Sequence, residues 1–283
     1  MLAVKHDPLV EINPEGLSAY CQRAVVQFTP TGVTWHTRNV LREEPLSIRV
    51  QGKPYAVVMR TPGDEIAHVA GFCLAEGIVD TYDEIKQIAC CDGADTNVVT
   101  VTLNPARLFK AGPILERRGF ISQSSCGVCG KEVVQDLTQS LRPLQDALRV
   151  KWDQLIACVD RFADYQALYE TTHTSHTAVA FDSYFQPQMA GEDVGRHNAV
   201  DKVVGKLLIS GKLANTSCIV LSSRISYELI QKVGRARIPI AMALSRPTAL
   251  AVELAEKLNI SLVFISSDHS LIAYSGAQRI IHA

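Results

Sequence analysis

The feature that most constrains the fold of this chain is the alternation of apolar strand-like runs with helix-like segments between residues 198 and 265. The expected strands span 218–221, 240–244 and 261–265, and the expected helices span 198–208, 227–236 and 248–258. Each strand is apolar throughout, which is typical of strands that are buried on both faces. The alternation therefore predicts an α/β fold with a largely parallel sheet that helices cover on both faces.

The first half of the chain follows a different pattern, with short strands and one strong helix. Strands are expected at 24–28, 46–50, 55–59, 87–90 and 98–103. The helix is expected to begin after Asp64 as its N-cap and to stop at Gly77. With a break near Gly112-Pro113, we expect a flexible tail over 1–18, a smaller N-terminal α+β domain over 19–112 and a second domain over 113–283.

Charge and hydropathy exclude several classes of function. The formal net charge of the 283 residues is -1, which argues against a nucleic-acid-binding protein. The sequence contains no run of about 18 apolar residues that would span a membrane. The N-terminal residues also lack the apolar stretch of a signal peptide. We therefore expect a cytoplasmic protein that binds neither nucleic acid nor a membrane.

Positive charge is concentrated in one part of the second half of the chain. Residues 196–257 contain ten Lys or Arg and four Asp or Glu. In open parallel sheets, ligands bind beyond the carboxyl ends of the strands. Polar turns follow all three strands there, at 222–224, 245–246 and 266–267, and they include Arg224 and Arg246. Helix capping accounts for the serines of these turns but not for the arginines, so the pattern favours an anionic ligand, with solvated helix faces as the alternative.

The motif that carries the clearest chemistry is Ser124-Ser125-Cys126-Gly127-Val128-Cys129-Gly130-Lys131. An amphipathic helix is expected to follow it, and a cysteine just before a helix is favoured as thiolate by the positive end of the helix dipole. Two thiols at this spacing can also resolve one another by disulfide exchange. The motif therefore indicates a nucleophilic sulfur that accepts another sulfur and hands it on.

Three further roles for the cysteine pair stay open. The pair supplies half of a tetrahedral zinc site, which His173 and His176 could complete. Thioredoxin-like redox exchange is a second possibility, although the usual aromatic and proline neighbours are missing. A purely structural role is a third. Zinc-dependent deamination is excluded, because it needs His-x-Glu upstream of Pro-Cys-x-x-Cys, whereas no His-x-Glu occurs and Ser125 precedes Cys126.

A second polar cluster lies at residues 191–198, directly before the expected helix. Arg196 could clamp a phosphate through two hydrogen bonds, and His197 could move a proton. The alternative is an internal ion-pair network that anchors the helix.

Together these motifs resemble those of the FdhD family of formate dehydrogenase accessory sulfurtransferases, over residues 44–279. The motifs that carry the resemblance are Glu44-Pro45-Leu46, Met59-Arg60-Thr61-Pro62-Gly63-Asp64, Gly71-Phe72, Glu76-Gly77, residues 124–131 and 192–202, Ser226, Glu228, Lys232, Pro247-Thr248 and Tyr274. The sequence departs from the family pattern at His173-Thr174, Ser223, Arg246 and Ser266, where the family usually has Gly-Gly, Gly, Ala and a basic residue.

The resemblance implies a cytidine-deaminase-like mixed sheet flanked by helices for residues 113–283. It also implies that Cys126 carries a persulfide taken from a cysteine desulfurase. The sulfur would pass to the bis-guanylyl molybdenum (or tungsten) cofactor, Mo-bis(molybdopterin guanine dinucleotide), as is required for formate dehydrogenase activity. The stretch associated with cofactor binding corresponds here to Phe264, Ile265, Ser266, Ser267, Asp268 and His269.

The sequence thus predicts a cytoplasmic sulfurtransferase in which Cys126 carries the persulfide and Cys129 assists or resolves it. Arg224 and the stretch 264–269 would hold the cofactor as a bound substrate, with Arg196 and His197 nearby. The expected partners are a cysteine desulfurase, formate dehydrogenase and a second copy of the chain in a homodimer, and no structural metal is expected. The alternatives are a cofactor-delivery chaperone without sulfur transfer and a zinc-stabilised domain.

Overall fold

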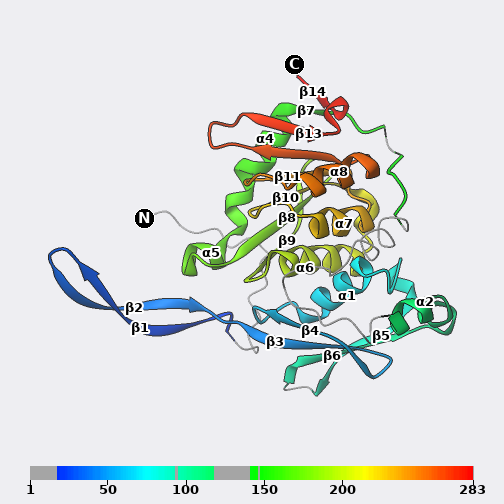
Figure 1. The fold of residues 1–283 in the computed structure, drawn as a ribbon, viewed down its shortest axis with the longest axis horizontal. Helices are drawn as coiled ribbons and strands as arrows, with labels where there is room; N and C mark the ends of the chain where they lie inside the picture. The colour runs from blue at the N-terminus through cyan, green and yellow to red at the C-terminus, as the bar shows by residue number, and fades with distance from the viewer. Residues whose placement is uncertain (1–17, 93–94, 118–140, 146, 283) are drawn as a thin grey trace.

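The computed structural model describes residues 18–92, 95–117, 141–145 and 147–282, which form a mixed α/β fold. A four-stranded sheet from the first half and a six-stranded sheet from the second half enclose a shared helical layer (Figure 1). Within the described residues, no helix is both long and apolar enough to cross a membrane. The α/β class with mixed sheets flanked by helices, which the sequence predicts, is confirmed.

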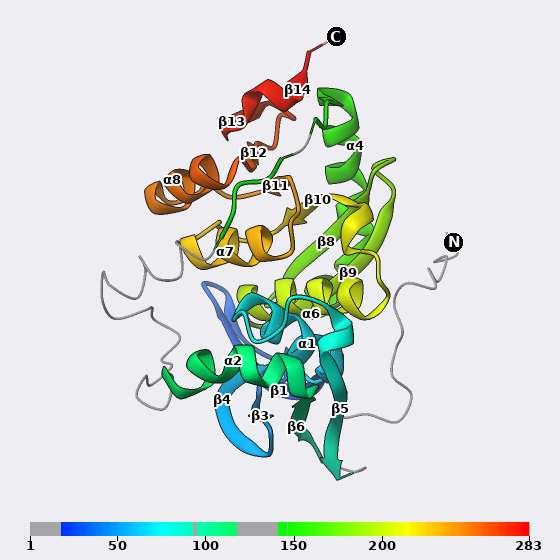
Figure 2. The same ribbon diagram turned by 90° about the vertical axis from the view of Figure 1, so that its right-hand side faces the viewer.

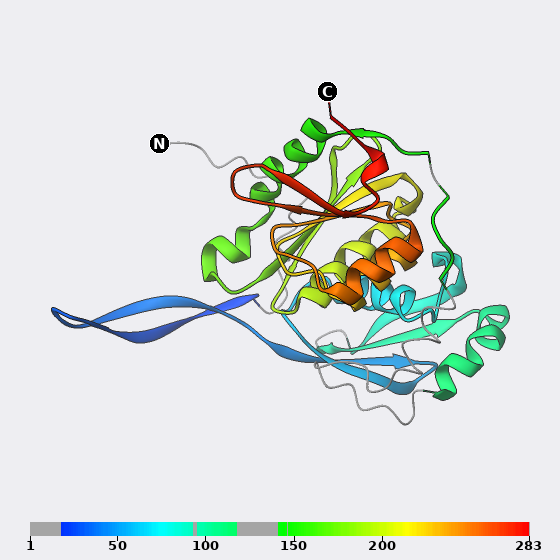
Figure 3. The ribbon, with the colours of Figure 1, turned by 45° about the horizontal axis from the view of Figure 1, so that its top comes forward.

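The first half of the chain builds a hairpin and the smaller sheet. The hairpin consists of β1 (Tyr20–Thr29) and β2 (Gly32–Leu41), which pair with each other alone among the described strands. The smaller sheet has the order β4-β3-β6-β5. Its strands are β3 (Glu44–Val50), β4 (Lys53–Arg60), β5 (Ile85–Asp92) and β6 (Asp95–Leu103), with η1 (Tyr82–Glu84) before β5. Figure 3 shows the hairpin extending away from both sheets.

Two helices accompany the smaller sheet. Helix α1 (Glu65–Ala75) occupies the expected position, with Asp64 as its N-cap residue and Gly77 just beyond its end. Asp64 makes no side-chain capping hydrogen bond, and its carboxylate instead pairs with the Lys206 ammonium at 2.7 Å. Helix α2 (Pro105–Arg117) was not expected, and it continues through Gly112-Pro113. The predicted break there is wrong for the local backbone, and the division into domains stays a prediction.

The larger sheet has the order β13-β12-β11-β10-β8-β9. Its strands are β8 (His176–Asp182), β9 (Pro187–Asp193), β10 (Thr216–Leu221), β11 (Ile240–Ala243), β12 (Ser261–Ile265) and β13 (Leu271–Ser275). The expected parallel pairing holds for β10, β11 and β12. The flanking strands β8, β9 and β13 pair antiparallel, so the sheet is mixed.

Helices cover both faces of this sheet, as the apolar strands predict (Figure 2). One face packs against α6 (Arg196–Ile209), α7 (Tyr227–Arg235) and α8 (Ala249–Leu258). The other face packs against α4 (Trp152–Phe162). The remaining elements are η3 (Ala163–Tyr165), α5 (Ala167–Thr172), η4 (Leu213–Asn215), η5 (Ala277–Arg279), and the paired short strands β7 (Val150–Lys151) and β14 (Ile280–Ile281).

A close crossing of α1 over α6 joins the two halves of the chain. A Cβ atom on Gly71 of α1 would collide with the backbone oxygen of Asp201, and one on Gly205 of α6 would collide with that of Ala67. The two helices therefore touch backbone to backbone. One hydrophobic core runs from the smaller sheet through this crossing to the α6 face of the larger sheet.

Candidate functional site

The strand ends bring the predicted ligand residues within the described part of the chain to one edge of the larger sheet. The register pairs Leu221 of β10 with Ala243 of β11, and Ala243 with Phe264 of β12, so the three parallel strands end together. Strand β9 also ends at this edge, where Asp193 lies opposite His176 at the start of β8. We call this side of the sheet the carboxyl edge. It collects the turns that carry Arg196, Arg224 and Arg246, one after another across the sheet.

His197 lies where the first turns of α6 and α7 meet. Its Nε2 is 3.4 Å from the Ser226 hydroxyl oxygen and 3.9 Å from a carboxylate oxygen of Glu228. Burial lowers the pKa of His197 to about 4, and the charges of Lys232 and Arg196 add to this effect. The imidazole is therefore neutral at physiological pH and can accept a proton or a hydrogen bond.

Arg196 and His176 belong to the same group of residues. Burial lowers the pKa of His176, and the nearby Arg196 guanidinium lowers it further. His176 was a candidate zinc ligand from its sequence, and the structure places it next to Arg196 instead. A permanently charged guanidinium beside two uncharged imidazoles presents donors and one positive charge to an anion.

The acidic residues of the 191–198 cluster turn inward, away from this group. The fully buried Asp193 carboxylate pairs with the Lys202 ammonium at 2.8 Å and accepts a hydrogen bond from the Asn198 amide at 2.8 Å. It also accepts one from the Thr61 backbone N–H at 3.1 Å, across the boundary between the two halves of the chain. The ion-pair network that the sequence left as an alternative is therefore real for these residues, whereas Arg196 and His197 stay outside it.

Glu192 is likewise used for structure. Its carboxylate accepts hydrogen bonds from the backbone N–H groups of Leu168 and Tyr169 at 2.7 and 3.0 Å, and from the Ser175 hydroxyl at 2.8 Å. Burial raises the pKa of Glu192, and these hydrogen bonds act in the opposite direction. The carboxylate holds the beginning of α5 against the end of β9.

A buried ion pair lies behind His197. The Lys232 ammonium of α7 donates to both carboxylate oxygens of Asp201 of α6 at 2.7 Å. Burial raises the pKa of Asp201 to about 6, while Lys232 acts to lower it. The pair fixes α7 on α6, and so fixes Ser226 and Glu228 relative to His197. Ser226, Glu228 and Lys232 belonged to the family motifs but were not predicted as site residues, because only the packing of α7 on α6 shows their role.

The predicted cofactor stretch 264–269 comprises the end of β12 and most of the turn between β12 and β13. The Ile265 side chain is buried in the core, so only its backbone is available to a ligand. The Ser266 hydroxyl donates to the Asp268 carboxylate, which also accepts from the Ser270 N–H at 3.1 Å. These hydrogen bonds lower the pKa of Asp268 to about 2. The turn is thus closed by its own hydrogen bonds and presents Ser267, Asp268 and His269 to solvent.

Two contacts connect this turn with its surroundings. The Arg246 guanidinium lies 5.7 Å from the centroid of the Phe264 ring, and His269 Nε2 lies 3.7 Å from a carboxylate oxygen of Asp160 on α4. In the sheet order, Arg224 follows β10, which lies between β11 and β8. The predicted ligand residues therefore share one edge but form two groups, Arg196 with His197 and Arg246 with Phe264, and Arg224 lies between them.

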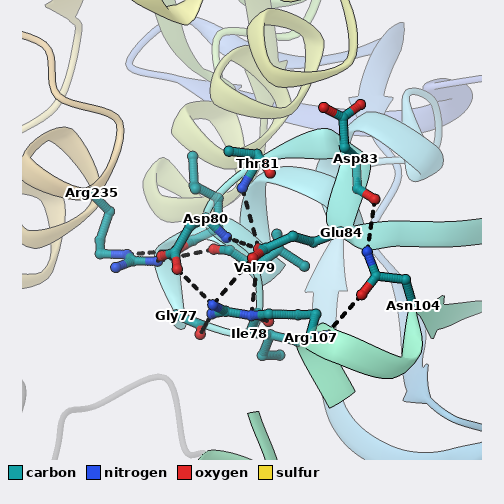
Figure 4. A network of polar contacts seen from close by, with 11 residues as sticks. Gly77, Ile78, Val79, Asp80, Thr81, Asp83, Glu84, Asn104, Arg107 and Arg235 are labelled. Carbon is teal, nitrogen blue, oxygen red and sulfur yellow. Dashed lines mark hydrogen bonds and ion pairs between the residues drawn. The ribbon is translucent and has the colours of Figure 1, made fainter. Parts of the chain in front are cut away.

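Cys126 and Cys129 lie outside the described residues, but both flanks of their segment are described. On the α2 side, the Arg107 guanidinium donates to the backbone oxygens of Gly77 and Ile78 at 2.6 and 2.7 Å, and pairs with Asp80 at 2.6 Å (Figure 4). On the other side, the Arg237 guanidinium donates to the Arg142 backbone oxygen at 2.6 Å.

The described residues also bear on metal binding. No three His, Cys, Asp or Glu side chains gather as a metal site within the ranges that the structure describes. Because Cys126 and Cys129 lie outside those ranges, the zinc interpretation stays untested.

Comparisons with known proteins agree on one family. The model of the FdhD/NarQ family matches residues 41–281. The chain is 37% identical over 269 residues to the sulfur carrier protein FdhD of Streptomyces avermitilis, covering 92% of this chain and 95% of that protein. It is 37% identical over 274 residues to the protein of that name from Mycobacterium bovis, covering 93% and 99%.

A solved structure shares the fold. The crystal structure of a protein provisionally described as a formate dehydrogenase accessory protein, from Desulfotalea psychrophila, matches with a TM-score of 0.75. The match covers 93% of this chain and 100% of the other at 23% sequence identity, so it bears on the fold alone.

Proposed function

The chain belongs to the FdhD/NarQ family, and from this membership we propose that it is a sulfur carrier in the maturation of formate dehydrogenase. The observation that carries the proposal is the close relation to proteins named sulfur carrier protein FdhD, in a chain that retains the Cys126-Gly127-Val128-Cys129 motif. We propose Cys126 as the carrier and Cys129 as its assisting thiol.

The chemistry requires a persulfide donor, which we propose is a cysteine desulfurase. The Cys126 thiolate attacks the terminal sulfur of the donor persulfide, a new S–S bond forms, and the donor cysteine leaves as a thiolate. Two-electron balance is kept because the transferred sulfur has the same oxidation state in both persulfides. If Cys129 then attacks Cys126, hydrosulfide leaves and a disulfide remains, which a dithiol reductant returns to two thiols.

The proposed acceptor is the bis-guanylyl molybdenum or tungsten cofactor, which would bind along the carboxyl edge as a substrate. Its phosphate groups are anionic, and the edge offers Arg196, Arg224 and Arg246 in a row. Arginine binds phosphate through two parallel hydrogen bonds. Serine hydroxyls and backbone N–H groups of the turns after β10 and β12 add neutral donors.

The experiment that tests this function compares Cys126→Ala with Cys129→Ala and with a control, Cys21→Ala, after incubation with a cysteine desulfurase and cysteine. We expect Cys126→Ala to gain no labile adduct with the mass of one sulfur atom and to leave formate dehydrogenase inactive. Cys129→Ala should load sulfur but mature the enzyme incompletely, and Cys21→Ala should behave as wild type.

Two results would overturn the assignment. A Cys126→Ala protein that still matures formate dehydrogenase would indicate a delivery chaperone that needs no sulfur transfer. One zinc ion per chain in the purified protein, lost in the His176→Ala variant, would indicate the zinc-stabilised domain, because a closed zinc site occupies both thiolates.

A further inference from the structure

His197 turns one of its two ring nitrogens toward α7 and leaves the other open. Nε2 lies 3.4 Å from the Ser226 hydroxyl oxygen and 3.9 Å from a Glu228 carboxylate oxygen. Within the described residues Nδ1 makes no hydrogen bond, and it is not shut off from solvent, since the side chain is 31% exposed. A neutral imidazole has one N–H and one lone pair. The position of the single proton therefore decides what His197 offers at the carboxyl edge.

Ser226 departs from the usual behaviour of a serine at a helix start. It is the N-cap residue of α7, but its side chain makes no capping hydrogen bond, although an N-cap serine ordinarily accepts one from a backbone N–H of the first turn. Its hydroxyl donates instead to the Glu228 carboxylate. A hydroxyl has one hydrogen, and hydrogen bonds to ionised groups are the stronger ones. Toward His197, the Ser226 oxygen can therefore act only as an acceptor.

Glu228 presents a negative charge to the same nitrogen. Burial alone would raise the pKa of Glu228, but hydrogen bonds from the Ser226 hydroxyl and from its own backbone N–H lower it. Nε2 of His197 thus faces two oxygens that accept hydrogen bonds, and one of them belongs to a carboxylate. A lone pair on Nε2 would be repelled there, whereas an N–H is attracted. These surroundings favour the tautomer that has its proton on Nε2.

We propose that Ser226 and Glu228 are positioning residues that hold the His197 proton on Nε2, so that Nδ1 accepts a hydrogen bond from the nucleotide bound at the carboxyl edge. The inference rests on the proposed function, which puts the nucleotide arms of the cofactor at this edge. The neighbouring Arg196 guanidinium has only donors and a positive charge, and so suits phosphate. A lone pair repels phosphate oxygens. His197 therefore contacts a different part of the nucleotide, either a guanine N–H or a ribose hydroxyl.

Nitrogen-15 NMR of the full chain at neutral pH tests the tautomer directly. The pKa of His197 is lowered to about 4 by burial and by the charges of Lys232 and Arg196, so the ring has one proton at that pH. A protonated ring nitrogen and one with a lone pair resonate far apart. The chain has eight histidines, and the signals missing from His197→Gln identify this ring. We expect the proton on Nε2, and we expect saturating guanosine diphosphate to shift the Nδ1 signal while Nε2 stays protonated.

Glu228→Gln tests the positioning role, because the direction of its effect separates two explanations. A side-chain amide can donate to Nε2, which moves the ring proton to Nδ1 and removes the acceptor. We therefore expect Nδ1 to be protonated in this variant, and we expect calorimetry to show guanosine diphosphate binding weakened about twofold to tenfold. If Glu228 acted only through its charge, its removal would strengthen the binding of an anion. Glu256→Gln, which removes an exposed carboxylate from the last turn of α8, is the matched control and should bind as wild type does.

A nucleotide without ribose hydroxyls distinguishes the two sources of the donor. If 2′,3′-dideoxyguanosine diphosphate still shifts the Nδ1 signal, the donor is a guanine N–H, and if the shift is lost, the donor is a ribose hydroxyl. The proposal is overturned if the wild-type proton lies on Nδ1, or if Glu228→Gln leaves the tautomer unchanged. It is also overturned if guanosine diphosphate does not bind, or binds without shifting the Nδ1 signal. Sulfur loading of Cys126 does not depend on these residues, so a failure of the proposed function is seen separately, in the persulfide experiment.

Discussion

His197 shows how neighbouring groups set the protonation of a single side chain at the carboxyl edge. Its imidazole is buried beside the charges of Lys232 and Arg196, and these influences together lower its pKa to about 4. In the unfolded chain its pKa returns to the ordinary value of about 6.5. The folded protein therefore resists protonation of His197 in the pH range in which the unfolded chain accepts it.

This difference predicts how stability depends on pH. Between about pH 6.5 and pH 4 the unfolded state binds the additional proton, so the free energy of unfolding falls as the pH is lowered. The contribution of His197 to the free energy of unfolding is fully present above about pH 6.5 and is lost as the pH falls. For one proton the slope is about 1.4 kcal/mol per pH unit. We expect His197→Gln to reduce the slope of the free energy of unfolding against pH by the amount that corresponds to about one proton. Urea unfolding at a series of pH values measures this slope.

The comparison of variant with wild type is needed because other groups titrate in the same range. Burial lowers the pKa of His68 to about 3, which gives a slope of the same sign. Burial raises the pKa of Asp201 to about 6, which gives the opposite sign. An unchanged slope in His197→Gln would show that this imidazole is protonated equally well in both states.

Arg224 gives a prediction about the ligand. It is exposed at the carboxyl edge between the two groups of predicted ligand residues. A hydrogen bond to a charged group contributes about 1.5–3 kcal/mol, so Arg224→Ala should weaken the binding of guanosine diphosphate roughly tenfold to over a hundredfold. Isothermal titration calorimetry measures this effect, and persulfide loading of Cys126 should be unchanged.

The matched control is Lys257→Ala, which removes an exposed positive charge at the other end of the sheet, near the C-terminus of α8. Equal affinities for wild type and Arg224→Ala, or no binding at millimolar concentration, would exclude the proposed nucleotide pocket. The role of Cys126 would be unaffected by that result.

At the scale of elements, α7 connects the candidate site with the α2 flank of the cysteine-bearing segment. Its first turn contacts His197, and Lys232 in its middle pairs with Asp201. At its end, Arg235 donates to the backbone oxygens of Leu74 and Val79 at 2.9 Å and pairs with Asp80 at 2.7 Å. Asp80 also pairs with Arg107 of α2, as Figure 4 shows.

Asp80 therefore joins α7 to α2, and it can be tested alone. Partial burial would raise its pKa, but the hydrogen bonds and charges of Arg235 and Arg107 outweigh this effect and lower the pKa. Asp80→Asn should reduce the free energy of unfolding by about 1 kcal/mol, a modest loss because its side chain is 54% exposed. Asp83→Asn, the control, should be neutral. Urea unfolding of both variants and of the wild type measures these differences. Equal free energies of unfolding for Asp80→Asn and the wild type would mean that Asp80 makes no net contribution to stability.

The elements differ in how well the sequence predicted them, for physical reasons. The strands and helices between 198 and 265 were placed nearly correctly because their periodicity and end signals are local. Strand β2 was missed because the hairpin has no core, so no face of residues 32–41 is consistently apolar. Strands β8 and β9 were missed because their ends coincide with the polar clusters near 173–176 and 191–198, which interrupt the apolar pattern that marks a buried strand.

The candidate site shows the same limit. The sequence identified Arg196 and His197 as candidate ligand residues from the density of charged and polar side chains in residues 191–198. It could not decide which charges of the cluster turn inward. That depends on Thr61, whose backbone contacts Asp193 from the other half of the chain, and on Lys202, which donates to the Thr61 backbone oxygen at 2.9 Å.

At the scale of the whole molecule, the crossing of α1 and α6 decides whether the two halves stay together. Gly71→Ala or Gly205→Ala would insert a methyl group where backbone already lies. Overpacking of this kind costs typically about 1–3 kcal/mol, and more where backbone must move. Each variant should lower the urea midpoint by an amount that corresponds to at least this loss.

Gly112→Ala is the control for this pair of variants. It lies within α2, and nothing would contact its Cβ within 4 Å. Alanine in a helix interior is more favourable than glycine by up to about 1 kcal/mol, so this variant should be neutral or slightly stabilising. If Gly71→Ala were equally well tolerated, α1 and α6 would not touch backbone to backbone.

The helix crossing also has a consequence for amide hydrogen exchange. Local openings expose amide protons one structural unit at a time, and the units are set by packing and not by chain order. Because α1 cannot separate from α6 without exposing the core that both share, its amides should exchange only when those of α6 do. The projecting β1–β2 hairpin in dilute solution should exchange far sooner. The amides of α1, in the first half of the chain, would then exchange together with those of α6 in the second half.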